Sequence, residues 1–292
     1  MNMDWMGKLP NTIKEKNLSD LIIPGSHDSG AWYLDVNGPL SPDENPLFKY
    51  FPKTVHNWSV TQDLDFVQQL EIGVRYFDLR IAPHPNKGSL HVVHGLYGNE
   101  IGEQLKKIND FLTEHPLEVV ILHFKRFLDF KETDHENLLN MIMHCFNGKL
   151  AKGLGDLQNC TLKHLNDNNH QVVVFYKHRN TRNFVLDNQW INSPWPNVQD
   201  TRKLLNALKT DLMSTHSTLF VSQCVLTPNA FTILSHICST LKSWESNVEN
   251  DILHWIKNLS HECLRNLNLI IVDFVTPNFC EHIIECNQIP SD

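Results

Sequence analysis

Three uninterrupted apolar runs constrain the fold of this chain more than any other feature. They occupy residues 118–124 (EVVILHF), 171–176 (QVVVFY) and 267–272 (LNLIIV). Strands that are apolar on both faces are typical of a parallel sheet covered by helices. The stretches between the runs repeat apolar residues at helical spacing, so strand and helix alternate about seven times along the chain. The pattern therefore predicts an α/β protein with a parallel sheet and helical crossovers.

Length and composition favour a barrel over an open sheet. The chain has 292 residues, of which 41% are hydrophobic, and this is enough to fill a sizeable core. No break in composition, internal repeat or low-complexity tract divides the sequence. We expect one domain over residues 1–292, built as a (β/α) barrel.

Charge and termini narrow the partners and the compartment. The net charge is −8, and the chain has no block of like charges, which argues against nucleic acid and against simple electrostatic adhesion to anionic membranes. The N-terminus MNMDWMGKLP has no signal-peptide pattern, and no apolar run approaches the roughly 20 residues of a spanning helix. The seven cysteines include no C-x-x-C pair, which is typical of free thiols in a reducing compartment. We expect a cytoplasmic protein without a transmembrane segment.

The segment LIIPGSHDSG, residues 21–30, marks the first candidate functional position. Its apolar start is followed by Pro24 and Gly25, which predict that the strand stops there. The chain would then leave the core and present His27 and Asp28 at the rim of the sheet. We predict that His27 is a catalytic base.

Polar side chains follow nearly every predicted strand. In a barrel, the carboxyl ends of the strands share one rim, where active sites lie. Carboxylates beside a histidine orient it and raise its basicity, whereas cations beside them bind an anion, with phosphate the leading candidate. In chain order the residues are His27 and Asp28, Asp78 and Arg80, His94, Lys125 and Arg126, Lys177, His178 and Arg179, Gln223 and Asp273.

Several of these residues also have plain structural interpretations. A single histidine after a strand, whether His27 or His94, is more often structural than catalytic. Asp78 could form a local ion pair with Arg80 that only closes the barrel, and Asp273 could cap the helix that follows it. For Arg179 and for His91 the structural interpretations, a solvated charge and a core histidine, are preferred.

A metal site is the main chemical rival, because histidines and aspartates on a barrel rim often bind zinc or calcium. Here Arg80 and Lys125 place fixed positive charges where a divalent ion would need carboxylates. A guanidinium can stabilise phosphate oxygens in place of a metal. We therefore predict that the site binds no metal and needs no cofactor.

The segments PGSHDSG, WSVTQDLDFVQQLEIGVRYFDLR, VHGLYG and FLTEHPLEVVILHF together resemble the X domain of phosphatidylinositol-specific phospholipase C. The resemblance is closest to short eukaryotic proteins that consist of little more than this domain. It is strongest over residues 18–127 and extends more weakly to the C-terminus. The resemblance implies a distorted TIM-type barrel that cleaves the glycerol–phosphate bond of phosphatidylinositol, giving diacylglycerol and a cyclic inositol phosphate.

The resemblance also implies a role for each rim residue. His27 corresponds to the general base that takes the proton of the inositol 2-hydroxyl, and His94 to the general acid that protonates the diacylglycerol oxygen. Asp28 corresponds to a carboxylate that assists the acid, and Asp273 to the carboxylate that orients the base. Arg80 corresponds to the arginine that occupies the calcium position in metal-independent bacterial enzymes.

The calcium-dependent signalling enzymes of this family carry Asn, Glu-x-Asp and a further Glu at the metal. The matching positions here are Asp28, Asp78-x-Arg80 and, approximately, Lys125, so the chain follows the calcium-independent pattern. The implied substrate-binding residues are Lys125, Lys177, Gln223 and Asp78.

The long connection over residues 31–58 contains four prolines and several aromatic residues. Long connections in compact domains are usually functional. We expect it either to contact the bilayer that holds the substrate, through Trp32 and Phe48, or to pack as a lid. Two alternatives to a calcium-independent phospholipase C remain. One is a catalytically weak inositol-phosphate-binding protein with the same fold, and the other is a metal-dependent glycerophosphodiesterase.

Overall fold

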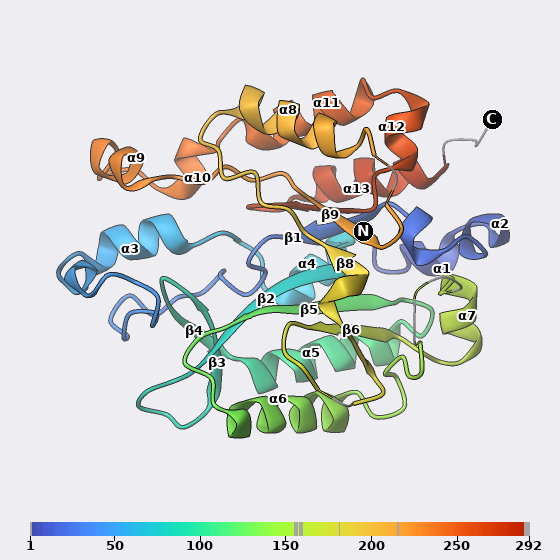
Figure 1. The fold of residues 1–292 in the computed structure, drawn as a ribbon, viewed down its shortest axis with the longest axis horizontal. Coiled ribbons are helices and arrows are strands. Elements are labelled where there is room, and N and C mark those ends of the chain that lie inside the picture. Colours follow the sequence, from blue (N-terminus) through green and yellow to red (C-terminus); the bar gives the residue numbers. More distant parts are fainter. Residues whose placement is uncertain (1, 155–156, 158–159, 181, 215, 289–292) are drawn as a thin grey trace.

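A computed structural model describes residues 2–154, 157, 160–180, 182–214 and 216–288. Its centre is a curled sheet in which the strands of the main path all pair in parallel (Figure 1). The order of strands is β7-β6-β5-β2-β1-β10-β9-β8. The edge strands β7 (Val185–Leu186) and β8 (Ile191–Asn192) do not pair with each other in this order, so the barrel is incomplete between them. The inner strands are β1 (Ile23–Ser26), β2 (Tyr76–Pro83), β5 (Val120–Phe127), β6 (Val172–Tyr176), β9 (Leu219–Gln223) and β10 (Leu269–Val272).

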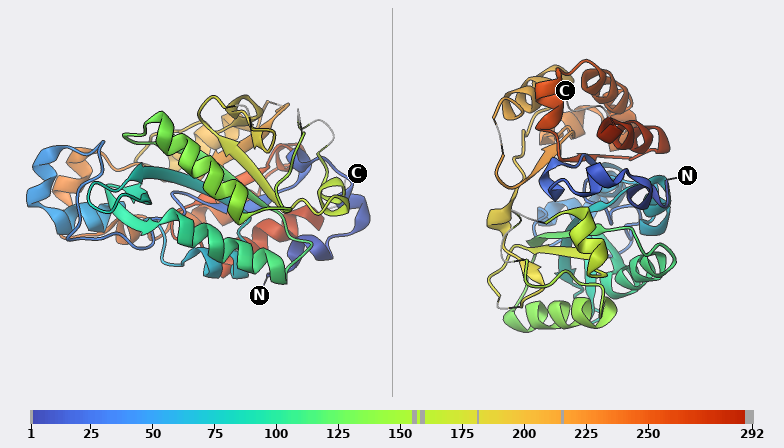
Figure 2. Two further views of the ribbon diagram at one scale, coloured as in Figure 1. Left: turned by 90° about the horizontal axis from the view of Figure 1, so that it is seen from below. Right: turned by 90° about the vertical axis from the view of Figure 1, so that its right-hand side faces the viewer.

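Helices cover the outside of the curled sheet (Figures 1 and 2). A large apolar cluster, including Leu105, Leu139 and Ile252, joins the helices to the outer face of the strands. The main covering helices are α4 (Phe66–Ile72), α5 (Ile101–Glu114), α6 (Glu132–Cys145), α8 (Thr201–Asp211), α11 (Val248–Lys257) and α13 (Pro277–Glu285). The α/β barrel-like architecture predicted from the apolar runs is therefore confirmed.

A second apolar cluster combines strand residues such as Ile121 and Ile271 with Trp5 and Met6 of α1 (Trp5–Lys8). Three further short helices are α2 (Asn11–Lys14), α7 (Leu162–Asp167) and α12 (His261–Arg265). Among the described residues, no helix is long and apolar enough to cross a bilayer.

The first strand differs from its prediction. Leu18–Asp20 forms a 3-10 helix (η1), and β1 runs through Pro24 and Gly25 instead of ending at them. Pro24 fits because its carbonyl accepts the hydrogen bond of Arg75 N, while its missing N–H is not needed. A Cβ at position 25 would lie 2.8 Å from side-chain atoms of both Tyr76 and Ile271, so only glycine allows the neighbouring strands to approach this closely.

The predicted third barrel strand is part of a hairpin. β3 (Leu90–His94) runs antiparallel to β2, and β4 (Leu96–Glu100) runs antiparallel to β3. The connection from β2 to β3 is far too short for the crossover that a parallel strand requires. Gly95 has φ +66°, a conformation that glycine adopts readily at the hairpin turn. Because β3 turns back along β2, His94 returns to the rim.

Helix boundaries were also partly wrong. The sequence pattern of residues 59–73, which ends in a glycine, predicts one helix that stops at Gly73. α4 does end there, but it begins only at Phe66, because Asp65 and Gln68 form a reciprocal capping box. Residues Pro52–Ser59 form a separate helix, α3, preceded by the 3-10 helix η2 (Pro46–Tyr50). Residues 230–241 are likewise predicted from their pattern to form one helix, but the chain there divides into α9 (Ala230–Ser235) and α10 (Leu241–Trp244). α3, α9 and α10 lie at one end of the molecule, on the left of Figure 1.

Candidate active site

The pairing of the first and last long strands brings His27 and Asp273 together. In the β1–β10 register Ser26 lies opposite Val272, so the next residue of each strand emerges at the same place. The Nδ1–H of His27 donates to Asp273 Oδ1 at 2.7 Å. This bond leaves His27 Nε2 facing the cavity. Asp273 does not cap the following helix, because Thr276 performs that role.

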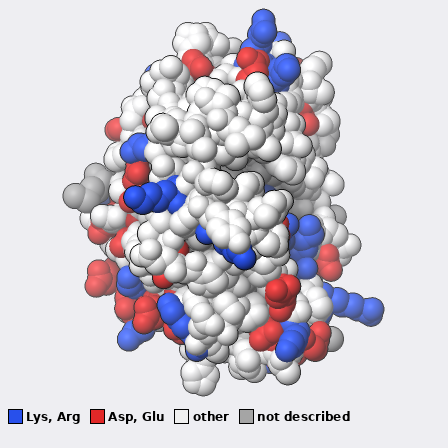
Figure 3. Space-filling model, turned by 90° about the vertical axis from the view of Figure 1, so that its left-hand side faces the viewer, with Lys and Arg blue, Asp and Glu red and all other residues white. Residues whose placement is uncertain are grey.

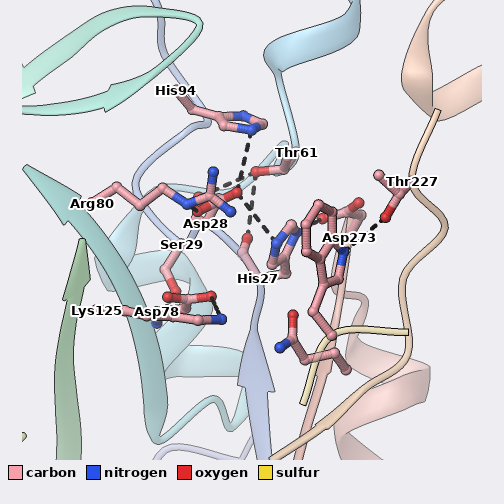
Figure 4. Close-up of polar contacts among 12 residues, drawn as sticks. His27, Asp28, Ser29, Thr61, Asp78, Arg80, His94, Lys125, Thr227 and Asp273 are labelled. Carbon is pink, nitrogen blue, oxygen red and sulfur yellow. Dashed lines mark hydrogen bonds and ion pairs between the residues drawn. The ribbon is translucent and has the colours of Figure 1, made fainter. Parts of the chain in front are cut away.

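Asp28 lies at the centre of the site (Figure 4). Its Oδ2 is 3.3 Å from His27 Nε2 and 3.3 Å from His94 Nε2, and its Oδ1 is 2.5 Å from Arg80 Nε. The residue is 3% exposed and has φ 39°, an uncommon backbone conformation for aspartate. Burial alone would raise the pKa of Asp28, but Arg80 and the two histidines hold it well below its ordinary value. One ionised carboxylate thus joins both imidazoles and the guanidinium.

The two imidazoles differ in their electrostatic surroundings. Burial lowers the pKa of His27, but Asp28 and Asp273 outweigh it, and the pKa lies above the ordinary value of 6.5. The pKa of His94 lies below 6.5, because burial and the nearby Arg80 outweigh the attraction of Asp28. The Nδ1–H of His94 donates to Ser59 O at 2.7 Å, so its Nε2 faces Asp28. The Nε2 atom of each histidine is therefore placed where it could exchange a proton with a bound substrate.

Asp78 pairs with Lys125 rather than forming a simple ion pair with Arg80. The distance from Lys125 Nζ to Asp78 Oδ2 is 3.4 Å, and Asp78 is fully buried. Asp78 Oδ1 has no hydrogen-bond partner among the described residues. Ser29 Oγ accepts a hydrogen bond from Asp78 N at 2.8 Å and so fixes β2 against β1. This oxygen does not line the cavity described next, so in this structure Asp78 serves as the partner of Lys125.

A cavity of about 660 Å³ opens above these groups. Gln223 lines it, but its Nε2 already donates to Ser193 O and Pro194 O at 3.1 and 2.9 Å. Arg179 is exposed and, as preferred from the sequence, lies outside the lining. Of the predicted site residues, the lining includes His27, Arg80, His94, Lys125, Lys177, Gln223 and Asp273, whereas Asp28 and Asp78 are buried beside it.

Sequence reasoning missed the residue that supports the hydrogen-bonded pair of His27 and Asp273. Gln62 Nε2 donates to His27 O at 2.9 Å and to Val272 O at 3.0 Å, and its Oε1 accepts from Val275 N. Gln62 is fully buried and thus ties the ends of β1 and β10 together. Its place between an aromatic loop and a helix carries no periodic signal that could have identified it.

The donor set can be tested for a metal. Ligand atoms of His27, Asp28 and Asp78 all lie within 4.8 Å of one another, which is close enough to hold an ion. Each carboxylate, however, already faces a cation, Arg80 at 2.5 Å and Lys125 at 3.4 Å. A divalent ion here would be repelled by both. The residues fit a site in which fixed cations replace the metal.

The chain matches the family described as phosphatidylinositol-specific phospholipase C, X domain, over residues 44–178. It is 34% identical to PI-PLC X domain-containing protein 2 of Mus musculus, with 100% of this chain and 89% of the mouse protein aligned. It is 32% identical to PI-PLC X domain-containing protein 3 of Homo sapiens, covering 98% of this chain and 94% of the human one. The chain belongs to this family.

Solved structures support the fold of the family member described here. The phosphatidylinositol-specific phospholipase C of Listeria monocytogenes superposes with a TM-score of 0.71 over 98% of both chains, at 19% identity. That of Staphylococcus aureus gives 0.68, with 98% of this chain and 97% of that one covered, at 22% identity. The likeness to these TIM-barrel enzymes confirms the fold class inferred from the resemblance.

Proposed function

We propose that this chain is a calcium-independent phospholipase C that cleaves phosphatidylinositol or a related phosphoinositide. Family membership supports a phospholipase-like function, and the shared contact of two imidazoles and a guanidinium with Asp28 carries the mechanistic part. The same arrangement is the one needed to move two protons around a phosphodiester while keeping a positive charge beside it.

The first step uses His27 as the general base. Its Nε2 takes the proton of the inositol 2-hydroxyl, whose oxygen then attacks the neighbouring phosphorus. Because nucleophile and phosphorus belong to one molecule, the attack has a large proximity advantage. Asp273 holds the imidazole with Nδ1 protonated and stabilises the imidazolium that forms. Lys125, Lys177, Gln223 and Asp78 would bind the inositol ring.

The second half of the step expels diacylglycerol. His94 donates the proton of its Nε2 to the glycerol oxygen as the bond to phosphorus breaks, and Asp28 holds the acid in line. Arg80 faces the negative charge that accumulates on the phosphoryl oxygens. The products are diacylglycerol and an inositol cyclic phosphate, with His27 left protonated and His94 neutral.

A slow enzyme, or a protein that mainly binds inositol phosphates, is the second candidate. The observation that favours it is the order of the two pKa values, since His27 lies above 6.5 and His94 below. The productive state needs neutral His27 with charged His94, which is the minor of the two singly protonated forms in the free protein. A bound phosphodiester beside His94 would favour the charged form and increase this fraction.

One assay separates the candidates. The purified protein is incubated with phosphatidylinositol vesicles in EDTA, and diacylglycerol and cyclic inositol phosphate are measured. Both products should form at the same rate with and without the chelator. Absence of product from a protein that still binds inositol phosphate would overturn the enzyme proposal, and activity that EDTA abolishes would instead indicate a metal-dependent phosphodiesterase.

The apolar borders of the cavity support contact with the bilayer that holds the substrate. On one side Phe48 and Phe51 line the cavity and are 39% and 54% exposed; on the other, Leu234 and Ile237 line it and are 68% and 46% exposed. Figure 3 views this end of the molecule, and the central part of its upper half carries no charged side chains. We propose that both borders, not only the segment 31–58 expected from the sequence, enter the lipid interface.

Vesicle sedimentation tests this contact. Replacing Leu234 and Phe231 (78% exposed) by serine should weaken binding to phosphatidylinositol vesicles while leaving cleavage of a short-chain soluble substrate unchanged. Met213 is 77% exposed and is not among the residues that line the cavity, so Met213→Ser is the matched control. Equal vesicle binding by all variants would show that Phe231 and Leu234 of α9 do not contact the bilayer.

A further inference from the structure

A second buried carboxyl group lies directly behind the carboxylate that supports His27. Glu245 sits between α10 and α11 and is 7% exposed. Its Oε1 accepts a hydrogen bond from Leu226 N at 3.0 Å. Its carboxyl group also forms a side-chain hydrogen bond with Asp273. Two acids in direct contact, both shielded from water, require a proton between them.

The contacts of the two acids indicate which one holds that proton. Asp273 accepts the Nδ1–H of His27 at 2.7 Å, an arrangement that stabilises its ionised form. Among the residues that the structure describes, no cation is found to act on Glu245 in the same way. The lysine nearest to it in the chain, Lys242 of α10, pairs with Asp63 at 2.5 Å. On α11, Glu249 accepts from Thr276 and adds no positive charge.

We propose that Glu245 is a positioning residue that, as a neutral acid, donates its O–H to Asp273 and thereby holds this carboxylate in line with His27. Asp273 would then accept two hydrogen bonds, one from the Glu245 O–H and one from the Nδ1–H of His27. A donor on Asp273 disperses its negative charge, so Asp273 attracts the His27 proton less strongly. Glu245 would in this way limit how far the pKa of His27 rises and keep more of the base in its neutral form.

The electrostatics of Glu245 agree with this geometry. Burial, followed by the charge of Asp273, raises its pKa to about 10. The N–H of Leu226 favours the ionised form but does not outweigh these effects. The carboxyl group therefore stays protonated across the range in which the histidines titrate.

The first experiment tests the protonation state and needs no enzymatic activity. Thermal unfolding of the wild type and Glu245→Gln is followed from pH 5 to pH 9. The folded wild type keeps Glu245 neutral, while the unfolded chain ionises it above about pH 4.3, so wild-type stability should fall with rising pH relative to the variant. Glu281→Gln, at an exposed position on α13, is the control. A pH-independent difference between wild type and Glu245→Gln would overturn the protonation assignment.

The second experiment tests positioning with two variants. The His27 pKa is measured by NMR, and kcat and KM on phosphatidylinositol vesicles are measured in parallel. Glu245→Gln keeps a neutral donor and should leave the His27 pKa and kcat near wild type. Glu245→Leu removes the donor and should raise the His27 pKa and lower kcat about tenfold with KM unchanged, the size of effect seen when a histidine loses an indirect hydrogen-bond partner.

The experiments distinguish failure of this inference from failure of the proposed function. Only the kcat measurement depends on the proposed function. A protein without phospholipase activity still reports the His27 pKa and the unfolding profile. An unchanged His27 pKa in a folded Glu245→Leu variant would overturn the positioning role. A large loss of kcat in Glu245→Gln would overturn it too, because that variant preserves the donor.

Discussion

Replacing Arg80 by methionine is the sharpest test of how the site stabilises charge. Arg80 Nε lies 2.5 Å from Asp28 Oδ1, and its side chain is 21% exposed, so the guanidinium is bonded to the buried carboxylate while remaining open to the cavity. Methionine keeps much of the apolar stem and removes every donor. The change therefore isolates the positive charge and its hydrogen bonds.

The expected loss has two parts. Removing one preorganised donor from the developing charge of a transition state costs about 2.7–4 kcal/mol, which corresponds to a roughly 10²–10³-fold fall in kcat. Asp28 also loses its strongest partner, so its pKa should rise toward the ordinary value, and the buried pair is broken. Breaking a fully buried pair costs about 3–5 kcal/mol of stability, and we expect the lower end or less because Arg80 is partly exposed.

The assay is kcat on phosphatidylinositol vesicles in EDTA, with unfolding temperature measured on the same preparations. Arg126→Met is the matched control: Arg126 also lines the cavity, but it is 49% exposed and pairs with Asp43 at 3.0 Å at the rim. This control should lose little kcat. Arg80→Lys should be intermediate, because lysine keeps the charge but not the guanidinium fork. A folded Arg80→Met variant with near wild-type kcat, or an equal loss in both methionine variants, would refute the role assigned to Arg80.

Three further predictions concern the acid–base pair. His27→Ala and His94→Ala should each lower kcat by about 10²–10⁴-fold and the double variant little further, since the two act in one step; additive losses measured by single-turnover kinetics would contradict this. The profile of kcat/KM against pH should be bell-shaped, its acid limb set by the lowered pKa of His94 and its alkaline limb by the raised pKa of His27. Asp273→Asn removes one of the charges that raise it, so that limb should move to lower pH, and an unmoved limb would contradict the assignment. Gln62→Leu should lower both kcat and unfolding temperature, because it removes three hydrogen bonds to backbone groups near the two strand ends and takes away the partner of Val275 N; near wild-type values of both would contradict its bracing role.

The strands that the sequence identified best are those whose environment is uniform along their length. β6 is buried along its whole length, and its apolar run matches the strand closely. β5 is buried from Val120 to Phe124 but continues to Phe127, beyond the end of its apolar run. β1 was misplaced because Pro24 and Gly25 are turn residues by local preference, and only the contacts with the neighbouring strands keep them extended. Local patterns contain no information about such neighbours.

The sequence predicted which residues gather at the rim and which carboxylate lies beside each histidine, but it did not predict which carboxylate pairs with which cation. The carboxyl ends of parallel strands meet on one rim, which is why residues chosen after predicted strands do lie together. His94 reached the rim by another route, the β2–β3 hairpin. The pairing of Asp78 with Lys125 and of Arg80 with Asp28 depends on strand register, which shifts between Leu79 and Arg80. Such a shift is invisible in the spacing of side chains.

The supporting residues lay beyond sequence reasoning for a different reason. Gln62 and Glu245 come from a loop and from the junction of two short helices, where neither period 2 nor period 3.6 applies. Each bonds to a group that is distant in the chain, as when Glu245 contacts Asp273. Their importance follows from burial and from the number of groups they satisfy, which are properties of the folded state.

The proposed site residues lie partly inside and partly outside the segment that the family model matches. Residues 44–178 contain the acid and the cations, His94, Arg80 and Lys125, but neither His27 nor Asp273. The base forms only when β1 pairs with β10, across 246 residues of sequence. A chain that matched the family over residues 44–178 alone could therefore bind a phosphodiester and still lack the base. The proposed catalysis therefore also requires the hydrogen bond between His27 and Asp273, which unites the two ends of the chain.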